Sequence, residues 1–410
     1  MSQSNRIVVL GAGAGGLRVA VGLDRLLLGH REYPVLLVDQ RDYHLIQPRL
    51  PDVAAGLAPV ESAALPLRRL LSGRKVEFVR ASVERLDLAS RVVHTSAGPL
   101  EYRWLVIALG SQPLISGIPG IAANALVLKS AEDARRIDRA VGEALRQAAW
   151  KLDQAQRSQL ATVVVAGGGY TGVELAAALA ERVRLLSPQY RLPEGSGRVL
   201  LVERAERVLP EYDREVADAV QRVLRRKCVE LRLGVAVTGA SGGEVSLSTG
   251  ENVRCGVLVW AGGIDVPAVV RASGVRLAPN GRLVVDRQMR VQGCQGVYAL
   301  GDLSFVLGEV AELNPPSARS AARQADVVAH NVFAEITGAA PREHSSDRQD
   351  IVVSLGQDDA VAMLHGVVVT GWRAALLRRL ECLRYLEAIA GPGGLLAGLR
   401  GGRVSHGWVG

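Results

Sequence analysis

Two glycine-rich turns in this chain have the residue types and spacing needed to bind the pyrophosphate of a dinucleotide. Each follows a short apolar run, over residues 7–10 and 163–166, and each leads into a segment with a helical pattern. The G-x-G-x-x-G glycines are Gly11, Gly13 and Gly16 in the first turn and Gly167, Gly169 and Gly172 in the second. The first glycine allows the tight turn, the second lets the backbone approach the phosphates, and the third lets helix and strand pack closely. The helix N-terminus then offers free N–H groups to the phosphates.

An acidic residue ends the apolar strand that follows each turn. Asp39 follows residues 35–38, and Glu203 follows residues 199–202. At this place in a dinucleotide-binding unit, the carboxylate accepts hydrogen bonds from a ribose. The second unit is longer between its last glycine and its acid, and we interpret residues 188–197 as a loop insertion. The sequence therefore predicts two bound dinucleotides, and the simplest use of two is electron transfer between a nicotinamide and a flavin.

Three further apolar runs, over residues 104–109, 257–260 and 297–300, read as strands that end beside glycines. The residues that follow them are Gly110 in the first case, Gly262 and Gly263 in the second, and Gly301 and Asp302 in the third. An acid at such a strand end can reach a sugar or ribitol hydroxyl. We expect a helix to begin near Pro315 and Pro316, because proline suits the first turn of a helix. Its N–H groups would face an electron-rich ring edge.

The composition limits the classes of protein to consider. A chain of 410 residues with 48% hydrophobic content allows two or three domains with sizeable cores. The net charge of +8 favours anionic partners, but scattered arginines and only 4% aromatics argue against nucleic acid. Residues 105–128 lack charge, yet their prolines and glycines predict a buried strand and a loop rather than a membrane span. The first turn begins so early that we expect no signal peptide.

The cysteines and the remaining patterns give a coarse organisation. Cys228, Cys255, Cys294 and Cys382 form no close pair, which predicts buried thiols in a reducing compartment and no metal site. Apolar runs alternating with helical patterns predict an α/β protein with two doubly wound units and parallel sheets. From about residue 345 the sequence changes to two short strands, 351–355 and 360–364, and then to helical segments. Residues 372–389 carry apolar residues near helical spacing together with arginines, which fits an interfacial helix on an anionic membrane or a helix packed on the core.

These motifs resemble those of the two-dinucleotide flavoprotein reductases, and within them the type II NADH dehydrogenases, which are NADH:quinone oxidoreductases. The resemblance covers most of residues 5–330. Beyond the two turns, it rests on the segments DYHLIQP at 42–48, GIPG at 117–120, KSAEDA at 129–134 and VWAGG at 259–263. It implies an FAD-binding domain of residues 1–115 and 281–344, into which an NAD-binding domain of residues 116–280 is inserted. A small C-terminal α+β region of residues 345–410 is the candidate membrane contact.

The resemblance also implies site residues. Non-covalent FAD would be contacted by Gly11, Gly13, Ala14, Gly16, Asp39, Gln40, His44, Ala108, Gly110, Gly301, Asp302 and Ala318. NADH, as substrate, would be contacted by Gly167, Gly169, Tyr170, Gly172, Glu203, Gly262 and Gly263. Glu174 would be the catalytic residue between nicotinamide and flavin, with a solvated helix-face acid as its alternative. His44 is equally compatible with a structural cap, and Tyr170 with simple packing.

The implied activity is transfer of electrons from NADH through FAD to a quinone without proton pumping. The implied setting is peripheral, at an anionic membrane on the cytoplasmic face of the cell membrane, with a homodimer as a candidate assembly. Two departures concern the acceptor. Arg319 and Arg323 replace the glutamines of the family's A-Q-x-x-x-Q, and a lysine usual near the flavin in the C-terminal part is missing, with Gln349 as our choice for its position.

Three other functions stay open from the sequence. A sulfide:quinone oxidoreductase needs a pair of redox cysteines at the flavin, which the wide cysteine spacing disfavours. A soluble NAD(P)H-dependent reductase, like the ferredoxin reductases, would pass electrons to a protein or another acceptor. A flavin and NADH sensor would bind both without turnover.

Overall fold

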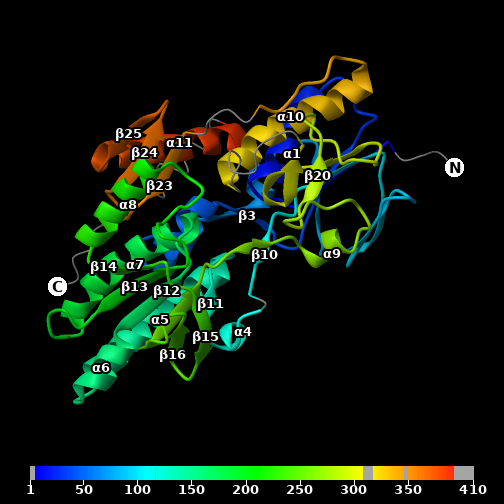
Figure 1. The fold of residues 1–410 in the computed structure, drawn as a ribbon. Coiled ribbons are helices and arrows are strands. Elements are labelled where there is room, and N and C mark those ends of the chain that lie inside the picture. The colour runs from blue at the N-terminus through cyan, green and yellow to red at the C-terminus, as the bar shows by residue number, and fades with distance from the viewer. Residues whose placement is uncertain (1–4, 116, 308–316, 346–349, 392–410) are drawn as a thin grey trace.

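The computed structural model describes residues 5–115, 117–307, 317–345 and 350–391. Figure 1 shows three parts: a first domain drawn from both the early and the late chain, a second domain from the middle, and a C-terminal region beside both. Gln349, Pro315 and Pro316 lie outside the described residues.

The first domain is built on a parallel sheet of five strands in the order β21-β9-β1-β2-β5. These strands are β1 (Ile7–Leu10), β2 (Val35–Asp39), β5 (Val76–Arg80), β9 (Trp104–Ile107) and β21 (Val297–Ala299). Helices α1 (Ala14–Leu26) and α10 (Ala318–Thr337) pack along each other (Figure 1). Because such sheets are covered on both faces, their strands are continuously apolar, and every residue of β1 and β9 is buried.

The second domain repeats this plan with the strand order β11-β18-β12-β13-β14, again all parallel. Its strands are β11 (Leu126–Val127), β12 (Thr162–Ala166), β13 (Arg198–Glu203), β14 (Val229–Leu233) and β18 (Val257–Trp260). Its long helices are α5 (Ala131–Ala149), α7 (Tyr170–Gln189) and α8 (Arg214–Arg226). The loop predicted at residues 188–197 was placed to begin too early, because α7 continues through Pro188 and ends at Gln189.

Each domain also carries an antiparallel three-stranded sheet just before its glycine-ended strand. These are β6 (Val83–Asp87), β7 (Val92–Thr95) and β8 (Gly98–Glu101) in the first domain, and β15 (Val237–Ser241), β16 (Glu244–Leu247) and β17 (Asn252–Arg254) in the second. Short pairs are β3 (Tyr43–Leu45) with β4 (Ala64–Pro66) and β20 (Leu283–Val285) with β22 (Ser304–Val306). Short helices are α2 (Leu50–Ala54), α3 (Leu67–Leu70), α4 (Ile121–Asn124), α6 (Gln154–Leu160) and α9 (Ala268–Arg271).

The chain crosses between the domains through two strands that lie side by side. β10 (Gln112–Pro113) leaves the first domain and pairs antiparallel with β19 (Ile264–Asp265), which returns to it. Val266 and Val270 then pack in the core of the first domain. First-domain packing therefore resumes at Val266, earlier than the boundary at residue 281 that the sequence suggested.

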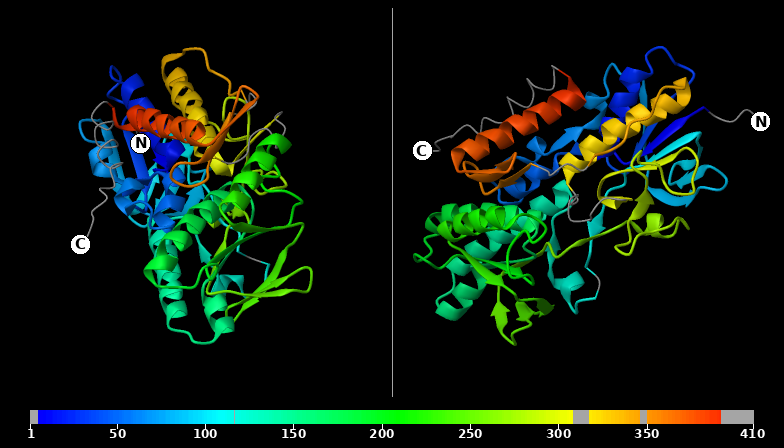
Figure 2. Two further views of the ribbon diagram at one scale, coloured as in Figure 1. Left: turned by 90° about the vertical axis from the view of Figure 1, so that its left-hand side faces the viewer. Right: turned by 45° about the horizontal axis from the view of Figure 1, so that its top comes forward.

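The C-terminal region is a three-stranded antiparallel sheet covered by a helix. The strands are β23 (Ile351–Ser354), β24 (Ala360–Leu364) and β25 (Val367–Thr370), and the helix is α11 (Trp372–Ala390). The sequence indicated the first two strands but not β25, whose residues are half-buried or exposed. Val353 and Val361 join the core of the second domain, whereas Leu386 and Ile389 of α11 join that of the first. The region thus packs against both domains (Figure 2).

Candidate functional site

The first glycine-rich turn has the geometry of a phosphate-binding loop. Gly11 has φ +97°, and a Cβ there would lie 2.3 Å from the carbonyl oxygen of Ala108. A Cβ on Gly16 would lie 1.9 Å from the carbonyl oxygen of Gly11, so the helix can approach the turn only without a side chain. A Cβ on Gly13, the N-cap of α1, would instead meet open space, with no protein atom within 4 Å. The turn is therefore tight at its base and open where a ligand would approach.

The second turn repeats this arrangement almost atom for atom. Gly167 has φ +114°, and its Cβ would lie 2.3 Å from the carbonyl oxygen of Ala261. A Cβ on Gly172 would lie 1.8 Å from the carbonyl oxygen of Gly167, while Gly169, the N-cap of α7, again faces open space. Neither α1 nor α7 has a side-chain cap, so their first N–H groups remain available to an anion.

Asp39 and Glu203, the acids at the ends of β2 and β13, stabilise these turns through hydrogen bonds. Asp39 Oδ2 accepts a hydrogen bond from the Ala12 N–H at 2.7 Å, and Glu203 Oε2 accepts one from the Gly168 N–H at 2.5 Å. The second oxygen of each carboxylate accepts from the backbone two residues further on, at Arg41 and Ala205. Each carboxylate oxygen has two lone pairs, so bracing leaves capacity for a ribose hydroxyl. Bracing is a role that the sequence reasoning did not assign to them.

Strand β21 of the first sheet is followed by Gly301 and Asp302, which lie at the same edge of the sheet as the first turn. The Gly301 N–H donates to Gln324 Oε1 at 2.7 Å, which ties this turn to α10. Asp302 accepts a hydrogen bond from Ser111 Oγ at 2.6 Å, and Ser111 directly follows Gly110 at the end of the β9 segment. Ends of β9 and β21 therefore meet beside α1, as expected for neighbouring parallel strands.

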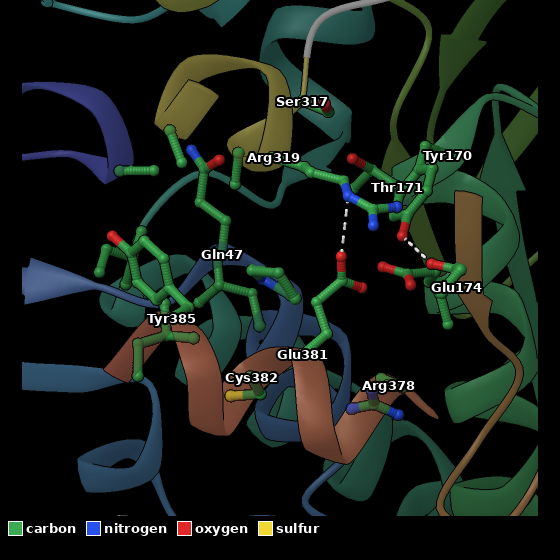
Figure 3. Close-up of a pocket in the computed structure, with 18 of the residues that line it drawn as sticks. Gln47, Tyr170, Thr171, Glu174, Ser317, Arg319, Arg378, Glu381, Cys382 and Tyr385 are labelled. Atoms are coloured by element: carbon green, nitrogen blue, oxygen red, sulfur yellow. Dashed lines mark hydrogen bonds and ion pairs between the residues drawn. The ribbon is translucent and has the colours of Figure 1, made fainter. Parts of the chain in front are cut away.

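A cavity of about 500 Å³ joins these elements. Its wall runs from Ala14 at the start of α1, past Asp302 and Ala318, to Tyr170 and Glu174 on α7. Figure 3 shows the side chains of α7, α10 and α11 pointing toward one another across it. Of the residues predicted for the site, these five, four cofactor contacts and the catalytic Glu174, are brought to one space by the fold.

Glu174 lies buried at one end of this cavity, with only 4% of its surface exposed. Ser354 in β23 donates its backbone N–H to Glu174 Oε1 at 2.8 Å. Burial raises the pKa of Glu174 to about 8, although the charge of Arg378 and the Ser354 N–H act in the opposite direction. The solvated helix-face alternative for Glu174 is therefore wrong. Its neighbour Tyr170 donates its hydroxyl to the Val352 carbonyl and is half-buried, and the burial raises its pKa.

Arg378 on α11 is a site residue that the sequence reasoning missed. It donates to Asp52 Oδ2 at 2.5 Å and to the Gly356 carbonyl at 3.3 Å, and it contacts Ser354 Oγ. It also lies close enough to Glu174 to stabilise that carboxylate electrostatically. A basic side chain from the C-terminal part thus does reach the cavity. Its signal in the sequence was only one arginine among several in residues 372–389.

The two arginines that replace glutamines differ in their surroundings. Arg319 forms an ion pair with Glu381 of α11, with 3.0 Å between Nε and Oε1, and it contacts the carbonyl oxygen of Asp350. Figure 3 shows this pair between Tyr385 and Gln47 on one side and Tyr170 and Thr171 on the other. Arg323, one turn further along α10, is exposed and also lines the cavity.

His44 has a structural place rather than one facing the cavity. It is fully buried, its Nδ1 is 2.8 Å from the carbonyl oxygen of Ala12, and its Nε2 is 2.9 Å from the Tyr385 hydroxyl. Burial lowers the pKa of His44 to about 4. Because both ring nitrogens are engaged, we propose that His44 holds the first turn against α11, which favours the structural alternative over a cofactor contact.

The other predicted residues lie at the sheet edges without forming a cluster of their own. Gln40 is exposed next to Asp39, and Ala108 supports Gly11 through its carbonyl group. Gly262 and Gly263 follow β18 and are exposed. Within the described residues, no group of three or more His, Cys, Asp and Glu side chains is arranged to hold a metal ion.

Comparisons with known proteins agree with this geometry. The family model described as pyridine nucleotide-disulphide oxidoreductase matches residues 5–325. The type II NADH:quinone oxidoreductase of Staphylococcus haemolyticus is 27% identical over 401 residues, covering 96% of this chain and 98% of that protein. NDH2 from Plasmodium falciparum in complex with NADH superposes with a TM-score of 0.84 at 17% identity, covering 97% and 98% of the two chains. The sulfide:quinone oxidoreductase from Aquifex aeolicus gives a TM-score of 0.74 at 19% identity, covering 94% and 92%. The predicted fold class is confirmed.

Proposed function

Because this chain belongs to the pyridine nucleotide-disulphide oxidoreductase family, we propose that it oxidises NADH and passes the electrons through FAD to a quinone, without pumping protons. The similarity to type II NADH:quinone oxidoreductases over nearly the whole chain supports this activity. The observation that carries the proposal is the single cavity that connects the first turn, Asp302 and Glu174. A flavin placed there would contact a nicotinamide donor and a second substrate within one cavity.

The first domain has the features that FAD requires. Open space at Gly13 and the uncapped N-terminus of α1 suit a pyrophosphate, and Asp39 stands at the ribose position. Asp302 lies where a ribitol hydroxyl would be bound, and the N-terminus of α10 at Ala318 lines the cavity. Bound FAD would supply the hydride-accepting ring, while the protein positions it and sets its electrostatic surroundings.

The second domain has the matching features for NADH. Gly169 and the N-terminus of α7 suit its pyrophosphate, and Glu203 stands at the ribose position. A carboxylate at this position binds the ribose diol and repels a 2′-phosphate, which favours NADH over NADPH. Tyr170 and Glu174 begin the same helix and face the cavity, so they border the space available to a nicotinamide ring (Figure 3).

Glu174 holds a proton where the reaction needs one. With a pKa of about 8, its carboxyl group is mostly neutral at pH 7. Reduction of a quinone to a quinol consumes two protons, so a neutral, buried acid at the cavity wall provides a local proton source. Arg378 beside it stabilises the carboxylate that remains after donation, and the Ser354 N–H holds its oxygen in place.

The acceptor side is the part of the cavity bordered by α10 and α11. Arg319 supplies N–H donors there and Glu381 holds them in position. Donors fixed before the reaction stabilise negative charge that develops on a quinone oxygen. The exposed Arg323 adds a positive charge to the same wall.

The same helix α11 offers a surface for a lipid bilayer. Trp372, Leu376 and Leu380 are 67%, 47% and 45% exposed, although all three are large and apolar. Arg373 and Arg384 are exposed on the same helix. This combination fits peripheral binding to an anionic membrane surface on the cytoplasmic side. No helix among the described ranges is long and apolar enough to cross a membrane.

The cysteines disfavour the sulfide:quinone alternative. Within the described part of the chain all four are free, and Cys382 is the cysteine that lines the cavity. Oxidation of sulfide in that class uses a pair of cysteines at the flavin. A soluble reductase with a protein acceptor remains the second candidate, and it differs by not needing the membrane.

Two measurements test the proposed function. Denaturing the purified protein should release a yellow cofactor that chromatographs as FAD, and NADH should then reduce a soluble quinone in steady state. Release of FMN, or the absence of flavin after reconstitution, would contradict the domain assignment. NADH oxidation with a protein acceptor but not with any quinone would favour the soluble reductase.

Vesicle co-sedimentation tests the membrane contact. Binding to anionic vesicles should weaken with salt, because the attraction is about 1 kcal/mol per basic residue near the surface and is screened. Trp372→Ser with Leu376→Ser should lose binding. Trp150→Ser is the matched control, because Trp150 is 79% exposed but lies at the C-terminal end of α5. Equal loss in both variants would contradict a specific role for α11.

A further inference from the structure

Lys129 links the two domains at the wall of the cavity. It belongs to the second domain, between β11 and α5, and its side chain is 28% exposed. Its Nζ donates to Ser111 Oγ at 2.8 Å and lies 3.8 Å from Asp302 Oδ2, and both partners belong to the first domain. Ser111 in turn donates to Asp302 at 2.6 Å. Three segments from distant parts of the chain therefore meet at one ammonium group.

The backbone of Lys129 is held in place by the start of α5. Ser130 is the N-cap of this helix, and its hydroxyl accepts from the Asp133 N–H at 3.0 Å. Asp133 returns the contact by accepting from the Lys129 N–H at 3.2 Å. This reciprocal pair is similar to a capping box, except that Asp133 accepts from the residue before the N-cap, and it fixes the direction in which the chain enters the helix. The side chain of Lys129 therefore projects from a rigid anchor.

We propose that Lys129 is a positioning residue that raises the reduction potential of the bound flavin, by holding a positive charge at the cavity wall beside Asp302. This inference rests on the proposed function, because it requires a flavin in the cavity. Accepting a hydride adds negative charge to the flavin ring, and a nearby fixed cation stabilises the reduced state relative to the oxidised state.

The residue type fits this role. The chain contains four lysines among 49 basic residues, so a lysine at this point stands out in an arginine-rich sequence. An ammonium group is a compact point charge that fits between a hydroxyl and a carboxylate. Burial lowers the pKa of Lys129, and the charge of Asp302 opposes that change. Removing the ammonium would also weaken the compensation of the negative charge of Asp302, although Arg282 still acts on it.

The test measures the flavin reduction potential by equilibration with a reference dye. Lys129→Met removes the charge at similar length, and Lys129→Arg keeps it. Lys151→Met is the matched control, because Lys151 is exposed and outside the cavity. At a fixed solution potential, Lys129→Met should lower the ratio of reduced to oxidised flavin at least tenfold, which is about 30 mV for a two-electron couple. Lys129→Arg should stay within about threefold of the wild type, and Lys151→Met should not change.

The outcomes separate this inference from the proposed function. Wild-type protein without flavin would remove the proposed function itself. Flavin bound to Lys129→Met with an unchanged potential would overturn the role of Lys129 and leave the proposed function intact. If Lys129→Met retains no flavin, titration of the apoprotein with oxidised and with reduced FAD decides, because the ratio of the two affinities fixes the potential of the bound flavin. A preference for reduced FAD at least tenfold smaller than in Lys129→Arg supports the inference, and an equal preference in both variants overturns it.

Discussion

Glu174 should make the stability of this protein fall as the pH rises toward 8. Its pKa is about 8 in the folded protein, against an ordinary value of 4.5 for an exposed glutamate. Between these two values the folded state holds a proton that the unfolded state has released. Stability therefore decreases with pH by about 1.4 kcal/mol per pH unit in this window and levels off above the folded pKa.

The isosteric change Glu174→Gln isolates this contribution. Glutamine keeps an oxygen for the Ser354 N–H but cannot ionise, and it shares every other titrating group with the wild type. Between about pH 5.5 and pH 7.5, the free energy of unfolding of the variant should rise by about 3 kcal/mol relative to that of the wild type. Urea unfolding at both pH values, followed by circular dichroism, gives this difference directly.

An exposed acid provides the control. The free energy of unfolding of Glu61→Gln should differ from that of the wild type by the same amount at both pH values, because Glu61 is exposed. Parallel pH curves for the wild type and Glu174→Gln would refute the reasoning, because they would mean that Glu174 is already ionised at neutral pH. Infrared spectroscopy gives a second check: a protonated carboxyl band at pH 7 should disappear in Glu174→Gln.

Three further predictions concern the turns and their supports. Gly11→Ala should lower the melting temperature and abolish FAD binding, because the added Cβ would lie 2.3 Å from the Ala108 carbonyl oxygen. Gly13→Val should also abolish FAD binding, but it should hardly change the melting temperature, because a Cβ there meets open space. Equal melting temperatures for the two variants would contradict this prediction. Glu203→Gln should narrow the preference in kcat/KM for NADH over NADPH, and an unchanged ratio would show that Glu203 is not the selector. Burial lowers the pKa of His44 to about 4, so the unfolded state binds a proton at a higher pH than the folded state does. As the pH falls from 6.5 to 4, the free energy of unfolding of the wild type should therefore decrease by about 3 kcal/mol, and acid unfolding curves of His44→Gln should lack this decrease.

Asp39 and Glu203 show which features of a site can be predicted from residues that are close together in the sequence. Asp39 and Glu203 were found because a strand, a turn, a helix and a second strand follow one another within a few dozen residues. Their ribose role was inferred from that order. Their hydrogen bonds to Ala12 and Gly168 were not, because backbone N–H groups leave no mark in the residue types.

His44 and Gln349 show where a resemblance reaches its limit. The motif around His44 marked it as a site residue, but the motif does not say which way the side chain turns. The structure turns it into the core, where it meets Tyr385 from more than 300 positions later in the chain. Gln349 lies outside the described residues, and the basic group that reaches Glu174 is Arg378 instead.

The sequence by itself determined the two dinucleotide units, their parallel sheets and the turns that face the cavity. These features depend on glycine spacing and on the period of apolar residues, which are properties of neighbours along the chain. Only the tertiary structure decided the protonation of Glu174, the Arg319–Glu381 pair and the link from Lys129 to Asp302. Each of these depends on side chains from different elements that come together only in the folded protein. Burial changes the free energy of a charged group by an amount that the residue type alone does not predict.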